Sequence, residues 1–404
     1  MTNQTRPLRS LARAAGVVAA AVAILVPVAA CGSGSTGTAG SAPPTGVHAS
    51  GHGGHDTAAV APAQPLRTGE RFLDLTVATP YTPSPPNGGT DDYRCLLLDP
   101  HVTAPVFLTG TQFRPENVPI AHHAIVFAVP PGQVAAARAR DAATGGQGWT
   151  CFGATGLETE EQQPAWVDSW TPGGVETLLQ HDVGFRLDPG SLLVLQVHYN
   201  LLATDGGPAG TDRPGVRLRL TDGTAATQPL STLQLSAPIE LPCAAGESGP
   251  LCDRAAAVAD VTQRFGAEVG DTQAQLLSAC SDGTAVPGDT QHCDIPVPQP
   301  VTVYATFGHM HLLGRSMKVE LNPGTAGART LLDVPSFDFD DQKLRPLPGP
   351  VDLGPGDTLR VTCTHDACLR RQLPALSKLP PRYVVWGDGS SDEMCLGLLT
   401  ATVR

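Results

Sequence analysis

The chain has 404 residues, of which 26 are lysine or arginine and 38 are aspartate or glutamate, so its formal net charge is -12. This acidic balance argues against nucleic-acid binding, which requires a basic surface, and favours a small or cationic partner. Since a single hydrophobic core stops growing beyond about 250–300 residues, the length favours two domains over one.

The first residues have the features of a bacterial lipoprotein signal peptide, which we assign to residues 1–31. Three arginines and no acidic residue precede an apolar run over residues 14–30, and small residues precede Cys31. The run is shorter than the ~20 apolar residues that a membrane-spanning helix needs. We therefore expect signal cleavage, lipidation of Cys31 and an extracytoplasmic protein that is anchored to the outer face of the cell membrane by acyl chains alone.

Residues 32–68 are rich in Gly, Ser, Ala, Thr and Pro. Such a composition cannot bury a core, so this segment is predicted to be a flexible tether. It contains His48, His52 and His55, which we interpret as solvated linker residues. A role in capturing copper is the alternative.

The remainder of the chain alternates polar and apolar residues in short segments, which predicts β-strands. Examples are RFLDLTVATP, SLLVLQVHYN and VTVYATFGHMHLL, and turn sequences such as DPGS and NPGT separate such segments. The pattern is typical of antiparallel β-sandwiches or barrels, so the predicted fold class is all-β. We place the domain boundary in the region 221–235, which gives domains at residues 69–222 and 223–404.

Three histidines of the N-terminal domain form a candidate metal site. His122 and His123 are adjacent, so a regular strand would point them to opposite faces, and a bulge or turn is needed for both to bind one ion. Pro119, just upstream, is compatible with a strand start there. His198, in the strand SLLVLQVHYN, is the candidate third ligand. A core histidine satisfied by a backbone carbonyl is the alternative for His198.

One stretch of the C-terminal domain departs from the β-pattern. Between Cys252 and Cys280, apolar residues recur at helical spacing, at positions 258, 261, 265 and 269. We predict one or two helices here, within an insertion at about residues 243–293. A structural clip closed by cysteines is the favoured interpretation, and a lid over a site is the alternative.

A second candidate metal site lies in the C-terminal domain. His309 and His311 are two residues apart in a predicted strand, so their side chains share one face. Two imidazoles in an apolar setting need a proton, a hydrogen-bond partner or a metal. Met394 is the candidate third ligand, and its thioether favours Cu(I), which indicates copper rather than zinc. Packing in the core is the ordinary role of a methionine.

Nine cysteines follow Cys31, and in an exported chain they predict a disulfide framework with one thiol left over. None of them forms a CxxC pair, which disfavours a clustered zinc site. The sequence leaves their connectivity open. The nine are Cys95, Cys151, Cys243, Cys252, Cys280, Cys293, Cys363, Cys368 and Cys395.

The strings AHHAIVF, LQVHYN, FGHMHLLG and SSDEMC resemble, in this order, the copper type II ascorbate-dependent monooxygenases, the family of peptidylglycine α-hydroxylating monooxygenase and dopamine β-monooxygenase. The resemblance runs from about residue 91 to residue 395. It implies two jelly-roll-like β-sandwiches, each with one copper ion, that face a solvent-filled cleft. Carried over by position, it assigns the electron-transfer copper to His122, His123 and His198 and the oxygen-activating copper to His309, His311 and Met394.

The resemblance also implies the reaction, hydroxylation of a C–H bond of a small organic substrate by O2 with two electrons from ascorbate or a similar one-electron donor. It implies the disulfides Cys95–Cys151 and Cys363–Cys395, and it makes Cys368 the candidate unpaired thiol. Gln196 matches the family's QVH string, and it belongs either to the region between the two sites or to ordinary packing.

Departures from the family pattern bear on the substrate. The peptide-amidating members carry an arginine two residues before the HxH pair and a tyrosine four residues after the methionine, and these residues bind a peptide carboxylate. Phe307 and Leu398 occupy those positions here, so peptidylglycine amidation is not expected. Met310 stands between the two histidines where threonine is common, and strand alternation points it away from the metal. The insertion at 243–293 has no counterpart in the animal enzymes.

The leading hypothesis is therefore a membrane-anchored copper monooxygenase. The alternative is a lipoprotein that binds copper for buffering or delivery without catalysis. The sequence leaves the substrate, the physiological reductant and the oligomeric state open, and it has no recognisable hydrolase spacing.

Overall fold

The computed structural model describes residues 61–85, 91–151, 153–159, 162–204, 209–339 and 341–403. The predicted signal peptide, the lipidation site at Cys31 and the histidines at positions 48, 52 and 55 lie outside these residues. Strands in antiparallel sheets dominate the described part, with few helices, so the all-β prediction is confirmed. None of the described helices has the length and apolar character needed to span a lipid bilayer.

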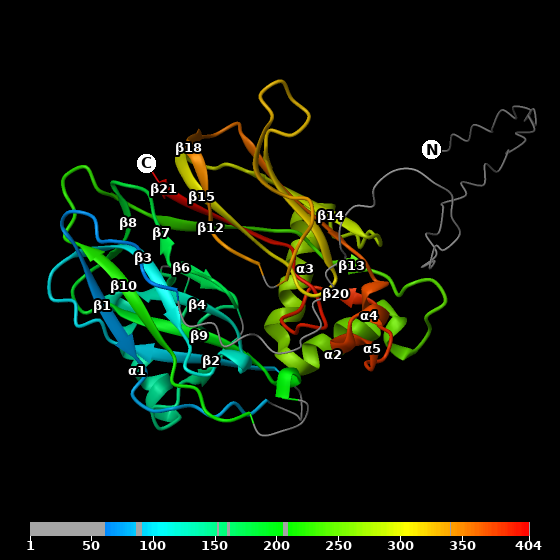
Figure 1. The fold of residues 1–404 in the computed structure, drawn as a ribbon. Helices are drawn as coiled ribbons and strands as arrows, with labels where there is room; N and C mark the ends of the chain where they lie inside the picture. Colours follow the sequence, from blue (N-terminus) through cyan, green and yellow to red (C-terminus); the bar gives the residue numbers. More distant parts are fainter. Residues whose placement is uncertain are drawn as a thin grey trace, which may run out of the picture.

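Two sheets make up the half of the molecule that is blue to green in Figure 1. Sheet I contains β1 (Glu70–Thr76), β3 (Val106–Arg114), β7 (Thr177–Leu178), β8 (Val183–Leu187), β10 (Gly215–Thr221) and β11 (Gln228–Pro229). Sheet II contains β2 (Asp91–Leu98), β4 (Ala121–Val129), β5 (Trp149–Thr150), β6 (Ala165–Trp170) and β9 (Leu192–Asn200). Their orders are β1-β10-β3-β8-β11, with β7 paired to β3, and β5-β2-β9-β4-β6. Of these described pairings, β11 with β8 is parallel and the others are antiparallel.

Three further sheets make up the other half. Sheet III contains β12 (Ser231–Ser236), β15 (Val301–His309), β18 (Arg345–Leu353) and β21 (Leu396–Val403), in the order β12-β21-β15-β18. Sheet IV contains β14 (Thr290–Pro296), β16 (Gly314–Leu321), β17 (Arg329–Val334) and β19 (Thr358–His365), in the order β14-β19-β16-β17. The small pair is β13 (Glu240–Leu241) with β20 (Val384–Val385). The described strands up to β11 thus pair with one another, and those from β12 onward pair with one another. The domain boundary at 222/223 stays a prediction.

Most of the helical turns lie in the second half (Figure 1). The α-helices are α1 (Val134–Ala143), α2 (Arg254–Phe265), α3 (Ala267–Ser281), α4 (Leu369–Gln372) and α5 (Pro374–Ser377), and the short 3-10 turns are η2 (Val118–Ile120), η3 (Pro131–Gln133), η4 (Leu201–Thr204) and η5 (Pro250–Cys252). The predicted helices between Cys252 and Cys280 are confirmed as α2 and α3. Asp253 caps α2 by accepting a hydrogen bond from the Ala256 amide at 2.9 Å. Gly266, with φ of 99°, separates the two helices.

The described disulfides confirm two predicted pairs, Cys95–Cys151 and Cys363–Cys395. Two more, Cys243–Cys252 and Cys280–Cys293, close the two ends of the helical insertion. Cys368 is disulfide-bonded as well, so the prediction that it is the unpaired thiol is wrong. All nine cysteines after Cys31 are thus disulfide-bonded, so their odd number does not identify a free thiol.

Both faces of sheet II are buried, and this determines where His198 lies. Leu193, Leu195 and Val197 of β9 point into the core between sheets I and II. The alternate residues Leu192 and Val194 belong to a second apolar cluster, which also contains the core of the second half. Because strand side chains alternate, the following even-numbered residues of β9 face the second half too. Sheet II therefore presents His198 at the junction of the two halves.

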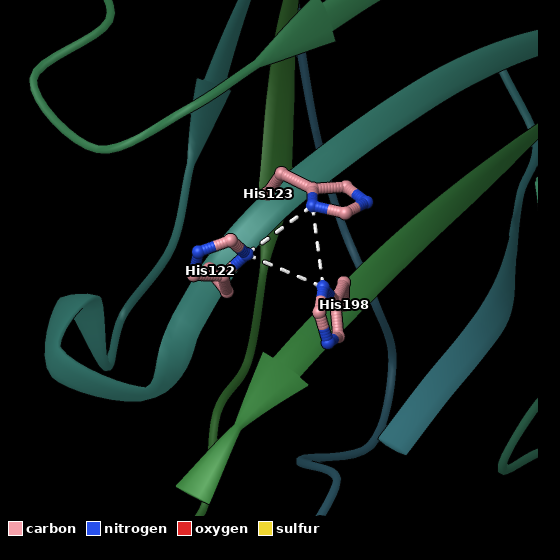
Figure 2. A group of neighbouring side chains, drawn as sticks. All are labelled: His122, His123 and His198. Carbon is pink, nitrogen blue, oxygen red and sulfur yellow. Dashed lines mark hydrogen bonds between the residues drawn. The ribbon is translucent and has the colours of Figure 1, made fainter. Parts of the chain in front are cut away.

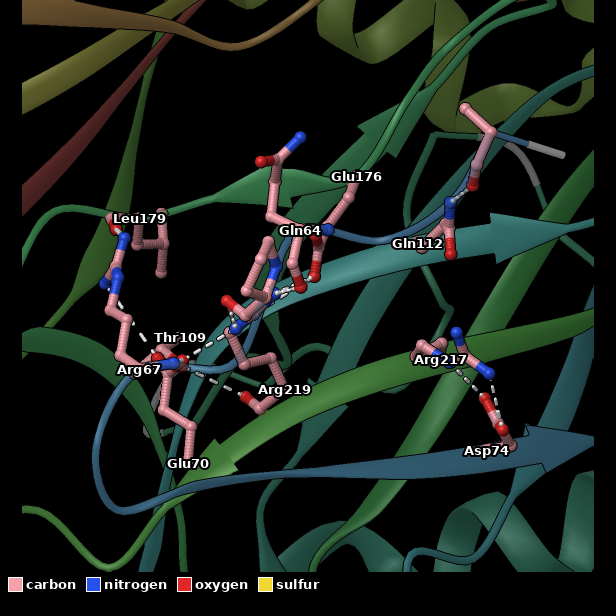
Figure 3. A network of polar contacts seen from close by, with 12 residues as sticks. Gln64, Arg67, Glu70, Asp74, Thr109, Gln112, Glu176, Leu179, Arg217 and Arg219 are labelled. Carbon is pink, nitrogen blue, oxygen red and sulfur yellow. Dashed lines mark hydrogen bonds and ion pairs between the residues drawn. The ribbon is translucent and has the colours of Figure 1, made fainter.

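The segment before β1 is bound to sheet I through Arg219, whose side chain is fully buried (Figure 3). Its guanidinium donates to the carbonyls of Gln64 and Pro65 at 2.7 and 3.0 Å. It also pairs with Glu70 at 2.7 Å and with Glu176 at 2.8 Å. Residues 61–68 were assigned to the flexible tether, but these contacts hold Gln64 and Pro65 on the sheet.

Candidate metal centres

Three imidazole rings meet between β4 and β9, as Figure 2 shows. We call His122, His123 and His198 the first cluster. Their Nδ1 atoms form a nearly equilateral triangle, with sides of 3.3, 3.3 and 3.2 Å. A point equidistant from the three atoms lies ~1.9 Å from each, close to the ~2.0 Å of an imidazole–metal bond. Among the described residues, no other three His, Cys, Asp or Glu side chains meet in this way.

A strand irregularity allows two adjacent histidines to share this site. The register of β4 against β9 shifts between Ala121 and His123, and His123 pairs directly with His198. The strand begins immediately after η2, which contains Pro119. The predicted bulge is therefore confirmed, and it turns His122 and His123 toward one point.

The contacts of His198 fix which of its nitrogens can bind a metal. Its Nε2 lies 2.8 Å from Oδ1 of Asp91. A carboxylate accepts hydrogen bonds, so Nε2 carries the proton and Nδ1 presents its lone pair to the triangle. The same Asp91 oxygen accepts from Asn200 at 3.1 Å and from Ser390 at 3.2 Å. A carboxylate that holds a histidine in this manner is the usual outer support of a metal ligand.

The surroundings of His123 keep its ring uncharged. Burial, followed by the neighbouring His198 and His122, lowers the pKa of His123 well below its usual range. The Tyr93 ring stacks on His198 with centroids 4.0 Å apart and an interplanar angle of 8°. Neutral imidazole is the form that binds metal ions, so the residues present fit copper.

His309, His311 and Met394, which we call the second cluster, line a single cavity. One buried carboxylate joins their chain segments: Glu393 accepts from the amides of His311 at 2.9 Å and Met394 at 3.2 Å. Across the sheet, His309 at the end of β15 pairs with Leu396 of β21. The disulfide at Cys395 anchors the residue after Met394. Two segments far apart in the sequence are thus held together at this point.

Hydrogen bonds also determine which nitrogen of each histidine in the second cluster can bind a metal. His309 Nδ1 lies 2.7 Å from Oε1 of Gln342, and His311 Nδ1 lies 3.3 Å from the carbonyl of Asp392. Both partners are acceptors, so each Nδ1 carries the proton and each Nε2 is left with a lone pair. Burial, with a contribution from His311, lowers the pKa of His309 to about 3. Two neutral imidazoles and a thioether are a donor set that suits copper.

The two clusters adjoin each other at the junction of the halves. The rings of His123 and His309 have centroids only 5.8 Å apart. Phe339 lies beside both clusters, 4.5 Å from His122 and 6.4 Å from His311 between ring centroids. The family resemblance implies that the two copper sites face a cleft. In this structure, one ring of the first cluster (His123) lies next to one ring of the second cluster (His309).

A cavity of about 1120 Å³ opens beside the clusters. His123 of the first cluster and all three residues of the second cluster line it. Both halves supply its apolar walls, for example Ile125 from β4 and Val269 from α3. A small organic molecule can therefore reach both clusters from one volume.

The residues that bear on the substrate occupy defined places. Phe307 and Leu398 are buried and face each other across β15 and β21, so no basic or phenolic group stands there. Met310 is fully buried in the apolar cluster of the second half. Gln196 lines the cavity. Its side chain accepts a hydrogen bond from the Gly153 amide at 3.2 Å and donates one to the Ala154 carbonyl at 3.1 Å.

Several supporting residues were not predicted from the sequence, namely Asp91, Tyr93, Gln342 and Glu393. Glu393 adjoins Met394 within the SSDEMC string, which is a local signal for it. The others reach the clusters from separate elements, and no spacing in the sequence connects them.

Residues 284–400 match the family described as "Copper type II ascorbate-dependent monooxygenase, C-terminal domain". The human protein named "Putative DBH-like monooxygenase protein 2" is 32% identical over 102 residues, which are 25% of this chain and 18% of that protein. The chain thus matches less than a fifth of that relative's length. Among solved structures, the major capsid protein P2 of bacteriophage PM2 has a TM-score of 0.29 at 8% identity, covering 83% of this chain and 98% of that one. A likeness that low carries no argument.

Proposed function

Residues 284–400 belong to the copper type II ascorbate-dependent monooxygenase family, and from this membership we propose that the chain is a copper-dependent monooxygenase. The observation that carries the proposal is the triangle of Nδ1 atoms in the first cluster, with sides of 3.2–3.3 Å. It adjoins a cavity lined by a second, chemically different cluster. Storage or delivery of copper needs no second site of another donor type, so this arrangement favours an enzyme.

We assign one copper ion to each cluster. Bound copper would supply one-electron redox chemistry and the activation of O2. Other residues of the chain orient the proposed copper ligands: Asp91 orients His198, while Gln342 and the Asp392 carbonyl orient His309 and His311. Burial lowers the pKa values of His123, His309 and His311, so these imidazoles are uncharged and ready to bind metal at neutral pH.

The proposed reaction is hydroxylation of a C–H bond in a small organic substrate. One atom of O2 enters the C–H bond and the other leaves as water, which requires two protons and two electrons. Ascorbate or a similar one-electron donor would supply the electrons. The apolar pair of Phe307 and Leu398 offers no partner for a peptide carboxylate, which supports a substrate other than a glycine-extended peptide.

We also propose that the protein acts outside the cytoplasm, attached to the membrane through lipid on Cys31. This proposal rests on the signal-like sequence, which lies outside the described residues. The disulfides give independent support, since such bonds persist mainly in oxidising compartments.

Copper content is the first test of the proposal. After loading with Cu(II) and removal of loosely bound metal, the purified protein is expected to hold two copper ions per chain, and a His309→Ala variant about one. His292→Ala, an exposed histidine on β14, is the matched control and should keep both ions. One copper or none in the unmodified protein would contradict the two-site assignment, as would an unchanged content in His309→Ala.

A further inference from the structure

The geometry of the second cluster depends on a short loop before β21. Residues 387–394, which we call the Met394 loop, end at the methionine itself. The carbonyl of Asp392 lies 3.3 Å from Nδ1 of His311. The carboxylate of Glu393 accepts hydrogen bonds from the amides of His311 and Met394. The position of this loop therefore sets where the thioether and the His311 ring lie relative to each other.

The helical insertion holds this loop through a buried ion pair. Arg264, in the last turn of α2, donates to both carboxylate oxygens of Asp392, at 2.6 and 2.8 Å. The Asp392 side chain is only 1% exposed, and Arg382 contacts it as well, at 3.1 Å. Asp260, one turn earlier on α2, accepts from Arg264 at 2.9 Å and so fixes the direction of the guanidinium. The ion pair thus attaches the Met394 loop to α2.

Two glycines allow the loop to lie directly against α2. A Cβ at Gly387 would meet Val261 of the helix at 3.1 Å. A Cβ at Gly389 would meet Arg264 at 3.1 Å and Phe265 at 2.9 Å, and the second contact is shorter than real side chains allow. Glycine is the residue that permits such a close approach of backbone to a neighbour. A larger residue at position 389 would therefore push the loop away from the helix.

The second helix of the insertion holds the start of the same loop. Gln273 of α3 is 3% exposed and accepts a hydrogen bond at 3.2 Å from the amide of Trp386, the residue directly before the loop. Its side chain also donates to Glu240 at 2.7 Å. Disulfides close both ends of the insertion. The two helices thus contact the loop from one covalently closed unit, α3 next to its start and α2 at Asp392.

We propose that the helical insertion is a brace for the second copper site, with Arg264 as a positioning residue that acts through Asp392. The brace keeps the Met394 thioether at bonding distance from the copper ion that His309 and His311 bind. A thioether favours Cu(I) only where it reaches the metal, so a displaced loop weakens Cu(I) binding. This inference rests on the proposed function, because it concerns the copper ion assigned to the second cluster.

The Cu(I) affinity of the second cluster tests the proposal. We would measure this affinity in the reduced protein by competition with bicinchoninate, and X-ray absorption would identify the ion bound to sulfur. Supporting partners of metal ligands change metal affinity by about 10–100-fold, so Arg264→Met should weaken Cu(I) binding by about that factor and reduce copper–sulfur scattering. Arg264→Lys keeps the charge but cannot form the two-pronged contact, so its loss should be smaller.

Arg254→Met is the matched control on the same helix. Arg254 forms a two-pronged pair with Glu240 at 2.6 and 2.5 Å, and the Glu240 side chain is 1% exposed, as that of Asp392 is. Denaturant unfolding should therefore show similar losses of stability in Arg254→Met and Arg264→Met. Because Glu240 lies outside the Met394 loop, Arg254→Met should leave the Cu(I) affinity and the copper–sulfur scattering unchanged.

Gly389→Ala is a second variant, which moves the loop without removing a charge. It should weaken Cu(I) binding in the same direction as Arg264→Met, because the added Cβ would meet Phe265. It also keeps the test available where Arg264→Met does not fold, and an unchanged Cu(I) affinity in Gly389→Ala is then the contrary result.

Unchanged Cu(I) affinity in Arg264→Met would overturn the proposal, as would an equal loss of affinity in Arg254→Met. Copper content measured on the same samples separates the brace from the proposed function. Two bound copper ions whose affinities do not respond to these substitutions would refute the brace alone. A second cluster that binds no copper in the unmodified protein would refute the proposed function, and the brace with it.

Discussion

A Met394→Ala variant is expected to lose ascorbate-dependent O2 consumption by at least ~100-fold, since even outer partners of metal ligands change activity by 10–100-fold. The physical reason is the donor set. A thioether stabilises Cu(I), the state that reacts with O2, and alanine leaves His309 and His311 without this soft ligand. The rate of O2 uptake with ascorbate, measured on copper-loaded protein after correction for free copper, is the quantity to compare.

Met310→Leu is the control for this experiment. Met310 is fully buried beside the second cluster but packs in the apolar core, so leucine should preserve the rate. X-ray absorption of the reduced protein adds a measurement independent of turnover, because copper–sulfur scattering should vanish in Met394→Ala and persist in Met310→Leu. An unchanged rate in Met394→Ala would refute its role. Absence of any ascorbate-dependent O2 uptake in the unmodified protein would favour the copper-buffering alternative.

Replacing Arg219 by methionine should produce the largest loss of stability. Its guanidinium is fully buried and pairs with Glu70 and Glu176, which are 4% and 3% exposed. Methionine keeps much of the apolar stem but removes the cation that the two buried carboxylates share. Breaking a buried pair in this way costs about 3–5 kcal/mol. Denaturant unfolding followed by circular dichroism would measure this loss.

Arg217 offers a matched control on the same strand. Like Arg219 it lies over the Phe72 ring at 4.9 Å, and it forms a two-pronged pair with Asp74 (Figure 3). That pair is exposed to solvent, where such contacts contribute about 0–1 kcal/mol. Arg217→Met should therefore change stability little. Equal losses in the two variants would show that the burial of Arg219 is not the cause.

The sequence predicted the elements whose signals are local. Alternation identified β9 and β15, helical spacing identified α2 and α3, and the adjacency of His122 and His123 required the bulge that the register of β4 contains. The pairing of Cys363 with Cys395 followed from the family resemblance. Each of these inferences depends on a short string or on one known pattern.

The sequence did not predict how the two clusters meet. The approach of His123 to His309 depends on the docking of sheet II against the second half, and docking arises from many apolar contacts of high sequence separation. The contacts of Arg264 and Arg382 with the buried Asp392 are equally non-local, since no spacing in the sequence connects these residues. The odd count of cysteines did not identify a free thiol either, since Cys368 is disulfide-bonded.

The apolar cluster that extends from Leu192 and Val194 of β9 into the second half has an evolutionary consequence. Neither half can be exchanged between proteins as a separate module, because each would expose the apolar face that the other covers. A duplication or fusion event must carry both halves together to yield a soluble product. The ligands of both candidate metal sites would therefore be inherited as one unit.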